Sequence, residues 1–367
     1  MKVLIASSST GGHIYPALAV AEEITKRDPG AEILFVGTKW EIAKDIVKAS
    51  GYRQEFIEAD GFDRKNPFNN VKVFYGLLKS AGDIKRILKG FSPDVVLGSG
   101  GYVSGPVLRV AKKSGYRTML MEQNVIPGAA NKIAEKYADR VFAAFDDTVK
   151  YFKKPRNVIV SGNPVRAEFA AAAADRDLLR EKYEVPGGAF CVLVFGGSQG
   201  AGAMNDAGCR LIESLAGNEG FYTILITGKQ LLAPVLERLA SGPAANAGGY
   251  KVLDYSDTIF ELYAAADLIV SRAGALTVTE IAHSGKASVL VPSPNVTNNH
   301  QYYNAAFPAD AGAAVLLQEG GLEGTGLPDI VTKLAADRPR LEEMGRKAAG
   351  LAKPDAARVI ADEIFGS

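Results

Sequence analysis

Short runs of β-branched and other apolar residues alternate with helix-like segments along the whole chain of 367 residues. Before the loop Ser161-Gly162-Asn163-Pro164, these runs cover 2–6, 33–36, 54–58, 94–97, 117–121, 140–143 and 157–160. After it, they cover 190–195, 222–226, 251–254, 267–270, 288–291 and 313–317. Because parallel strands are joined by crossovers that usually contain a helix, the alternation predicts parallel sheets wrapped by helices. A chain of this length forms roughly two domains. We therefore predict an α/β protein of two doubly wound, Rossmann-like domains facing a cleft.

The composition is that of an ordinary globular protein, with 47% hydrophobic and 23% charged residues. A net charge of +1 gives no overall signal for nucleic acid, and no nucleic-acid partner is expected. Two cysteines are too few for a disulfide framework, which fits a reducing compartment. No run reaches the roughly 18 apolar residues of a membrane span. We expect a cytoplasmic protein that can still touch a membrane surface.

The stretch 271–280, Ser-Arg-Ala-Gly-Ala-Leu-Thr-Val-Thr-Glu, follows an apolar run and continues in helical rhythm to Gly285. This order predicts a strand, a tight turn of small residues and then a helix start. A helix start attracts phosphate, and Glu280, one to two turns inside, can accept hydrogen bonds from ribose hydroxyls. The alternative is that Thr277-x-x-Glu280 is only a capping box.

Three glycine-rich loops follow predicted strands, at 8–13, 98–105 and 196–200. Glycine lets the backbone approach a ligand closely and adopt a positive φ. Neither the dinucleotide pattern G-x-G-x-x-G nor a Walker loop occurs in the sequence.

The first glycine-rich loop carries His13 and precedes a helix that we expect from Ala17 to Lys26. His13 can act as a base or bind a phosphate, and a structural histidine is the alternative. The three histidines lack metal-ligand spacing, so we expect no metal and no other cofactor.

The stretch 64–89 has seven basic residues and one acid, Asp83. Apolar and aromatic residues are interleaved with them, a composition that suits a segment lying on an anionic bilayer. An ordinary surface helix is the alternative, and nucleic acid is less favoured because no recognised module accompanies the patch. The residues predicted to face the membrane and the acceptor are Lys72, Phe74, Leu78, Lys79, Lys85, Arg86 and Lys89.

Seven motifs occur in order at 10–19, 100–106, 122–128, 162–166, 196–200, 274–280 and 300–305, beginning with Thr-Gly-Gly-His-Ile-Tyr-Pro-Ala-Leu-Ala. Together they resemble the MurG family, the bacterial transferases that move N-acetylglucosamine from UDP-N-acetylglucosamine to lipid I to give lipid II. The resemblance covers nearly the whole chain and implies the GT-B fold. It implies an acceptor and membrane-facing domain at 1–163, completed by the helix 354–367, and a donor domain at 164–353.

The resemblance also implies an inverting hexosyltransferase that uses no metal. Such an enzyme would serve peptidoglycan synthesis, cell shape and cell division from the cytoplasmic face of the cell membrane. Its partners would be the UDP-sugar, undecaprenyl-linked lipid I, the anionic membrane surface and other cell-wall enzymes.

The resemblance further implies roles for individual residues. The backbone of Ser256 would meet the uracil, and Gln301 and Asn124 would contact the N-acetylglucosamine. His13 is the candidate catalytic base, and Thr10, Gly11 and Gly12 would line the reaction site with it. UDP would be held by Arg166, Ser198, Ala275, Leu276, Thr277, Val278, Thr279 and Glu280, with the Glu280 carboxylate on the ribose.

Some positions depart from the family pattern. Ser7 and Ser8 stand where glycines usually open the first loop, Met121 where a histidine is common, and Ala43 where a glutamate is frequent.

Two alternative functions stay open. One is another GT-B enzyme, such as a glycolipid glycosyltransferase or a UDP-sugar epimerase. The other is a non-catalytic scaffold that binds a nucleotide sugar.

Overall fold

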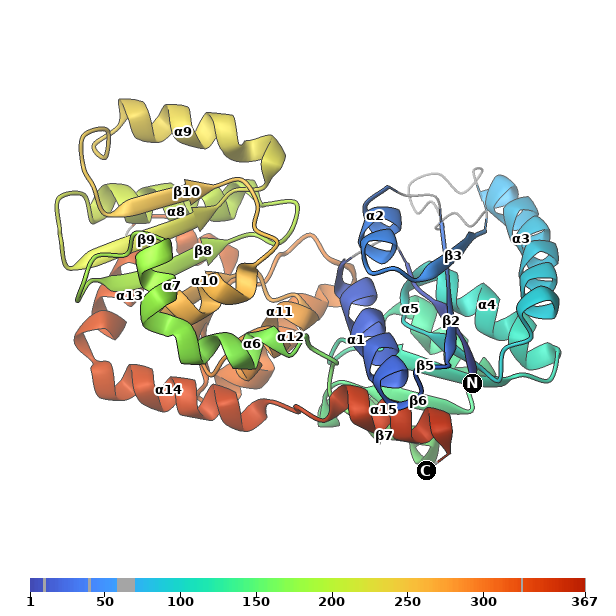
Figure 1. Ribbon diagram of the computed structural model, residues 1–367. Coiled ribbons are helices and arrows are strands. Elements are labelled where there is room, and N and C mark those ends of the chain that lie inside the picture. Colours follow the sequence, from blue (N-terminus) through green and yellow to red (C-terminus); the bar gives the residue numbers. More distant parts are fainter. Residues whose placement is uncertain (9–10, 39–40, 58–69, 325, 367) are drawn as a thin grey trace. The chain divides into compact units, whose positions relative to one another are not determined.

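The computed structural model describes residues 1–8, 11–38, 41–57, 70–324 and 326–366, and for 41–44, 70–79 and 173 it describes the backbone alone. The chain forms two compact units, Met1–Arg166 with Lys353–Ser367, and Ala167–Ala352 (Figure 1). The first unit ends three residues later than the predicted boundary at 163, and the chain rejoins it one residue before 354.

Every predicted strand is present, and its ends lie within two residues of the expected ones. The first unit contains β1 (Lys2–Ala6), β2 (Glu32–Gly37), β3 (Arg53–Phe56), β4 (Val95–Gly98), β5 (Arg117–Glu122), β6 (Arg140–Ala143) and β7 (Val158–Val160). The second contains β8 (Phe190–Phe195), β9 (Phe221–Ile226), β10 (Tyr250–Leu253), β11 (Leu268–Ser271), β12 (Ala287–Leu290) and β13 (Ala314–Leu316). All pairs are parallel, in the orders β3-β2-β1-β4-β5-β6-β7 and β10-β9-β8-β11-β12-β13. The predicted α/β class is confirmed.

Along the chain, α-helices connect successive strands in both units, except that β6 and β7 are joined through the 3₁₀ turns Asp146–Tyr151 and Pro155–Asn157 (Figure 1). Further helices lie between the two sheets in the sequence and after the last strand. Those of the first unit are α1 (Gly11–Arg27), α2 (Glu41–Ala49), α3 (Asn70–Phe91), α4 (Gly101–Lys113), α5 (Ala129–Ala134) and α15 (Ala356–Phe365). Those of the second are α6 (Glu168–Ala171), α7 (Arg176–Lys182), α8 (Gly202–Ser214), α9 (Leu232–Ser241), α10 (Ile259–Ala265), α11 (Ala275–His283), α12 (His300–Asp310), α13 (Gly326–Ala336) and α14 (Arg338–Leu351).

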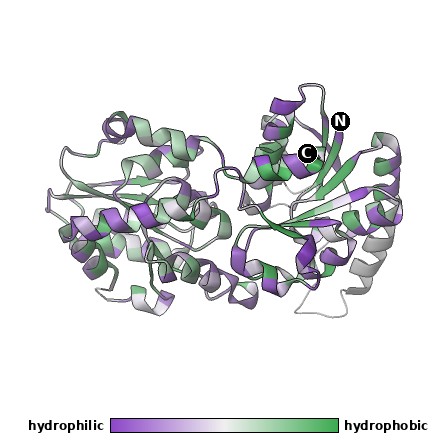
Figure 2. Ribbon diagram, turned by 90° about the horizontal axis from the view of Figure 1, so that it is seen from below, coloured by the Kyte–Doolittle hydropathy of each residue, from purple (hydrophilic) through white to green (hydrophobic). Residues whose placement is uncertain are grey.

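Both faces of the first sheet are buried, as expected for a parallel sheet. Along β1, Val3 and Ile5 belong to an apolar cluster that includes α1 and α15, whereas Leu4 and Ala6 belong to one that includes α3 and α4. Figure 2 shows the strands coloured mainly as hydrophobic. Through Ile360, α15 joins this core although it follows the second unit in the sequence.

The first helix starts earlier than predicted. It begins at Gly11 rather than Ala17, so that Gly11, Gly12 and His13 form its first turn instead of a loop. Ile14 is buried in the core, and Ser99 Oγ donates a hydrogen bond to the His13 carbonyl O at 2.5 Å. These tertiary contacts outweigh the low helix propensity of glycine.

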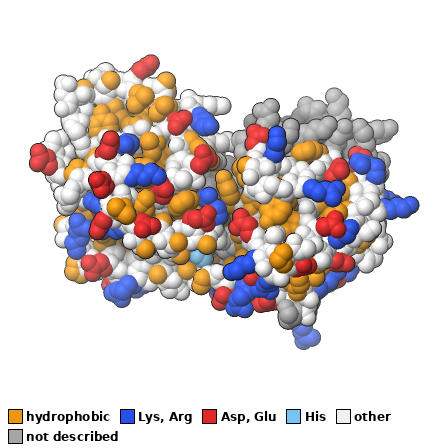
Figure 3. Space-filling view, in the orientation of Figure 1, with side chains coloured by type: hydrophobic (Ala, Val, Ile, Leu, Met, Phe, Trp, Pro, Cys, Tyr) orange, Lys and Arg blue, Asp and Glu red, His pale blue; other side chains and the backbone are white. Residues whose placement is uncertain are grey.

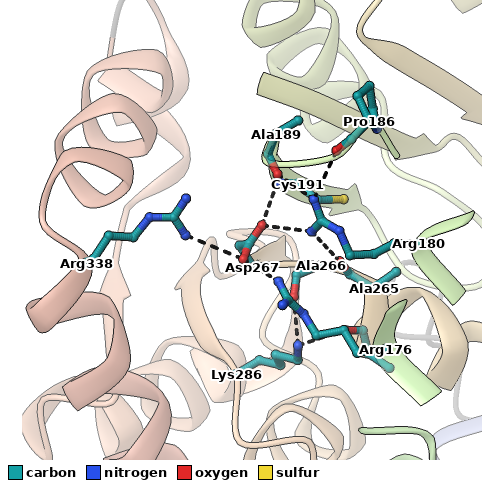
Figure 4. A network of polar contacts seen from close by, with 11 residues as sticks. Arg176, Arg180, Pro186, Ala189, Cys191, Ala265, Ala266, Asp267, Lys286 and Arg338 are labelled. Carbon is teal, nitrogen blue, oxygen red and sulfur yellow. Dashed lines mark hydrogen bonds and ion pairs between the residues drawn. The ribbon is translucent and has the colours of Figure 1, made fainter. Parts of the chain in front are cut away.

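A polar network lies at the amino edge of the second sheet (Figure 4). Asp267 directly precedes β11 and accepts hydrogen bonds from Arg176 at 2.7 Å and Arg180 at 3.2 Å. It also accepts one from the Cys191 N–H at 2.8 Å, and Arg338 lies 3.6 Å away. The network therefore joins α7, the start of α14 and two neighbouring strands.

Basic and acidic side chains are interspersed on the face shown in Figure 3, in keeping with the net charge of +1. None of the helices that the structure describes is long and apolar enough to span a bilayer.

Candidate active site

Each sheet reverses its strand order once, between β1 and β4 in the first unit and between β8 and β11 in the second. In open parallel sheets, ligands bind outside the carboxyl ends of the strands at such a reversal. The glycine-rich loops and the turn singled out in the sequence follow these four strands. We call the carboxyl edge of the first sheet the first half-site and that of the second sheet the second half-site.

His13 lies in the first half-site, in the first turn of α1. Its imidazole is half-buried, and its Nδ1 lies 2.9 Å from the Oγ of Ser8. Gly100 has φ +99°, and a Cβ there would come within 2.6 Å of the His13 Cδ2. A side chain at Gly100 would therefore strain the backbone and collide with the imidazole. The lack of a side chain at Gly100 therefore makes room for the imidazole of His13, a group of the protein itself.

The start of α4 is fixed against the end of β1. Ser104 Oγ accepts from the Gly100 N–H at 2.9 Å and lies 2.8 Å from the Gly100 carbonyl O and 3.2 Å from that of Ala6. Ser104 is fully buried. The serine thus holds the α4 start beside His13.

A buried carboxylate organises the loop after β5. Glu122 is 2% exposed, and its Oε1 accepts from the N–H and side-chain amide of Asn124 at 2.9 and 3.1 Å. Its Oε2 accepts from the Gly128 N–H at 3.0 Å and from Asn131 at 2.8 Å. Burial raises the pKa of Glu122, and these hydrogen bonds oppose the shift. The sequence alone assigns Glu122 no role, although a carboxylate that ends an apolar strand is a usable signal.

Gln123 links this loop to the rest of the first half-site. Gln123 donates to the Ser99 carbonyl O at 2.9 Å, and its own carbonyl O accepts from Asn163 at 3.1 Å. Arg166, which the resemblance assigns to UDP, belongs to the first unit, and its guanidinium carbon lies 5.0 Å from the ring centre of Tyr15 on α1.

The second half-site centres on the start of α11. Gly274 is the N-cap and Thr277 lies in the first turn, so the alternative of a capping box at Thr277 is wrong. Within the described part of the chain, no side chain caps this helix start. By helix geometry, the N–H groups of residues 275–277 lack an intrahelical acceptor, which favours an anion. Glu280 is 9% exposed in the second turn, and Gly285, at φ +61°, ends the helix as predicted.

The turn before α11 is held by neighbouring elements. Asn304 of α12 donates to the Ala273 carbonyl O at 3.2 Å. Arg272 forms an ion pair with Glu319 and donates to the Val291 carbonyl O at 3.3 Å. These contacts of Arg272 are not predicted from the sequence, where their only signal is a charged residue in a turn of small ones.

Three further predicted substrate contacts lie at the carboxyl edge of the second sheet. Ser198 is exposed in the loop after β8, and Gln301 lies in the first turn of α12, where its Oε1 accepts from the Ser293 N–H at 2.9 Å. Ser256 is half-buried in the loop after β10. Gly200, at φ +76°, lies against the Thr227 carbonyl O, so this glycine too serves a contact within the protein.

Some predicted residues lie outside this description. Thr10 is not among the described residues, and the side chains of Lys72, Phe74, Leu78 and Lys79 on α3 are also outside it. Lys85, Arg86 and Lys89 are described, and all three are exposed. Among the described residues, no group of three or more histidine, cysteine, aspartate or glutamate side chains could hold a metal ion.

Comparison with known proteins defines the class of this chain. The family models for the N-terminal and C-terminal domains of glycosyltransferase family 28 match residues 3–143 and 191–360. Together with the two Rossmann-like units, these matches define a glycosyltransferase with the GT-B fold.

Relatives define the family within that class. The chain is 36% identical over 366 residues to a UDP-N-acetylglucosamine–N-acetylmuramyl-(pentapeptide) pyrophosphoryl-undecaprenol N-acetylglucosamine transferase of Alkaliphilus metalliredigens, covering 100% of this chain and 99% of the relative. It is 38% identical over 360 residues to the transferase of the same name from Caldanaerobacter subterraneus, covering 98% of each. The crystal structure of Acinetobacter baumannii MurG superimposes with a TM-score of 0.78 at 29% identity, covering 100% and 99% of the two chains. The chain belongs to the MurG family.

A UDP-GlcNAc 2-epimerase from Neisseria meningitidis also superimposes, with a TM-score of 0.74, 13% identity and full coverage of both chains. At that identity, the similarity shows the fold alone.

Proposed function

We propose that this chain transfers N-acetylglucosamine from UDP-N-acetylglucosamine to the muramoyl sugar of undecaprenyl-linked lipid I, which yields lipid II for peptidoglycan synthesis. The observation that carries the proposal is the 36–38% identity, over nearly the whole chain, with transferases named for this reaction. The protein is a hexosyltransferase, and the nucleotide sugar and lipid I are its two substrates.

The second half-site is the proposed donor site. The start of α11 would hold the UDP diphosphate, because its first-turn N–H groups and helix dipole favour negative charge. Glu280 would accept hydrogen bonds from the ribose hydroxyls. Since the Gln301 Oε1 is taken by the Ser293 N–H, the Gln301 Nε2 is the amide group that would donate to the sugar.

The first half-site is the proposed acceptor site, with His13 as the base. The acceptor's hydroxyl oxygen attacks the anomeric carbon of the donor, and the bond from that carbon to the UDP oxygen breaks with inversion. The hydroxyl proton passes to His13, a transfer that typically contributes 10²–10⁴-fold to the rate. UDP leaves with the negative charge, which the α11 start would stabilise. Asn124, fixed by Glu122, would contact the transferred sugar.

The α3 helix is the proposed contact with an anionic membrane. In its described part, Ile84, Ile87 and Leu88 are buried against the sheet, whereas Lys85 and Lys89 are exposed. This division supports the proposal that α3 keeps its apolar side in the core and presents its cations to lipid headgroups. Each cation near the membrane surface contributes about 1 kcal/mol to binding.

Transfer of labelled N-acetylglucosamine to a lipid I analogue tests the reaction. We expect Glu280→Ala to raise the KM for the UDP-sugar about 10- to 100-fold, because hydrogen bonds to a charged group contribute roughly 1.5–3 kcal/mol each. The matched control is Glu237→Ala, which removes an exposed carboxylate on α9. UDP-sugar binding without transfer by the wild type would favour a scaffold, and an unchanged KM in Glu280→Ala would refute the ribose contact.

Sedimentation with vesicles of phosphatidylglycerol and phosphatidylcholine tests the membrane contact. We expect the double variant Lys85→Glu, Lys89→Glu to bind more weakly than wild type. The control Lys113→Glu, Lys153→Glu makes the same charge change on other exposed positions of the first unit. Equal binding by all three proteins would refute a role for α3.

A further inference from the structure

We propose that Ser8 is a positioning residue for His13, whose Nδ1–H donates to the Ser8 hydroxyl so that Nε2 keeps the lone pair that takes the acceptor's proton. The inference rests on the proposed function for its catalytic consequence. Its structural part, the tautomer of His13, can be measured without substrate.

The contact between Ser8 and His13 is closely confined. The Ser8 Oγ lies 2.9 Å from the His13 Nδ1, and Ser8 is only 3% exposed. A Cβ at Gly101 would overlap the Ser8 Oγ, so the α4 start lies directly against this hydroxyl. A Cβ at Gly100 would come within 3.0 Å of the His13 Nε2 and closer still to Cδ2. The ring is therefore held between the hydroxyl of Ser8 and the backbone of the α4 start.

The backbone of His13 is fixed as well. Its carbonyl O accepts from Ser99 Oγ at 2.5 Å, and Ser99 is fully buried and also accepts from Gln123. With the main chain and Nδ1 both fixed, Nε2 has a defined direction. A base needs such a direction because proton transfer requires hydrogen-bond geometry with the reacting hydroxyl.

A serine hydroxyl can either accept a hydrogen bond from Nδ1–H or donate one to a bare Nδ1. If Ser8 donates, Nε2 carries the hydrogen and cannot act as the base. If Ser8 accepts, Nε2 is the basic nitrogen, and the same Nδ1–H···Oγ bond persists after Nε2 has taken the proton. In this second arrangement the hydrogen bond between His13 and Ser8 does not change during the reaction, and a site that needs no reorganisation favours catalysis.

The chain contains its own reference for the tautomer. The His300 Nδ1 lies 2.9 Å from the Thr297 carbonyl O. A carbonyl only accepts, so His300 must carry its hydrogen on Nδ1. Since the chain has three histidines, their nitrogen-15 signals can be assigned with few variants.

The experiment is nitrogen-15 NMR of histidine-labelled protein, with His13→Gln to assign the His13 signals. In the wild type we expect His13 to show the Nδ1–H pattern of His300. In Ser8→Ala and Ser8→Gly we expect that pattern to shift toward Nε2–H, and in Ser8→Thr to be retained. The matched control is Ser7→Ala, because Ser7 is also buried and its Oγ donates to the Ser8 carbonyl O instead.

Transfer kinetics on the same variants test the catalytic consequence. We expect kcat to fall about tenfold in Ser8→Ala and Ser8→Gly, a part of the 10²–10⁴-fold that a general base contributes. KM for the UDP-sugar should stay unchanged, and Ser8→Thr should restore kcat. Thermal unfolding of each variant separates this loss from misfolding.

Each outcome has a definite meaning. An Nε2–H tautomer in the wild type, or an unchanged spectrum in Ser8→Ala, would overturn the proposal. A changed tautomer with unchanged kcat would overturn its catalytic part. If the wild type transfers no sugar at all, the proposed function fails, and with it the catalytic part, while the spectra still decide whether Ser8 sets the tautomer.

Discussion

Glu122 in the first unit and Asp267 in the second are both carboxylates largely removed from water, but their partners differ. The described donors to Glu122 are all uncharged N–H groups, and all lie within nine residues of it in the sequence. Asp267 instead faces arginines, with Arg176 and Arg180 lying 91 and 87 residues away.

The two carboxylates also lie at opposite edges of their sheets. Glu122 ends β5 at the carboxyl edge of its sheet, and its hydrogen bonds shape one loop next to the first half-site. Asp267 precedes β11 at the amino edge of its sheet, and its ion pairs tie α7 and α14 to the strands (Figure 4). In folds of this kind ligands bind at the carboxyl edge. The comparison indicates that one carboxylate positions a functional loop and the other stabilises the fold.

The largest expected effect is on stability at the amino edge. Asp267→Asn would leave Arg180, whose side chain is 12% exposed, without its counter-charge. Breaking a buried ion pair from one side costs about 3–5 kcal/mol of unfolding free energy. Chemical denaturation measures the loss. The control is Asp177→Asn, which changes an exposed carboxylate on α7 and should change the unfolding free energy by less than about 0.5 kcal/mol. Equal losses in the two variants would show that Asp267 stabilises the fold no more than an exposed carboxylate does.

The next effect depends on pH and concerns Lys286, which donates to the carbonyl O atoms of Ala264 and Ala266 beside Asp267. Burial lowers the pKa of Lys286 from 10.5 to about 8. Between these values the unfolded chain binds more protons than the folded one, so stability rises with pH. The unfolding free energy of the wild type, relative to Lys286→Met, should therefore rise by up to about 3 kcal/mol across this window. A difference that stays constant from pH 8 to 10.5 would contradict burial as the cause.

Glu122→Gln should separate function from stability at the carboxyl edge. The amide nitrogen cannot accept from the Gly128 N–H and Asn131, so we expect a loss of about 1–3 kcal/mol in unfolding free energy. Transfer should fall more, by about 10²-fold in kcat/KM, because the loop that carries Asn124 is no longer held at Gly128 and Asn131. The matched control is Glu135→Gln, which alters another buried carboxylate, bound by the Lys154 N–H. If both variants lose activity equally, Glu122 has no special role in the site.

The smallest effect is expected at the rim of the Asp267 network. The side chain of Arg338 is 50% exposed, lies 3.6 Å from Asp267 and stacks 4.9 Å from the ring centre of Phe190. Exposed pairs of this kind contribute about 1 kcal/mol or less, so Arg338→Gln should lower the unfolding free energy by that amount, and less in high salt. A loss as large as that of Asp267→Asn would mean that the whole network acts as one unit.

Much of the fold could be predicted from the sequence because its signals are local. The apolar runs mark all the strands, and Gly285 marks the end of α11. The start of α1 was predicted too late because Gly11 and Gly12 have a low helix propensity, which the contact of Ser99 with His13 outweighs.

The candidate site could be predicted less completely. Local pattern and family resemblance singled out His13 and the α11 turn. They gave no role to Glu122 or Arg272, because a carboxylate or guanidinium shows its purpose only through the groups that meet it in space.

By itself, the sequence determined the class of fold, the order of its strands and helices, and the family. These follow from hydrophobic periodicity and from motifs whose members lie close together in the chain. The tertiary structure alone decided that Ser8 faces His13, that Glu122 holds Asn124 and that Asp267 gathers its arginines. Such contacts depend on the exact placement of side chains, and in the case of Asp267 they join residues far apart in the chain, for which a linear sequence has no local signal.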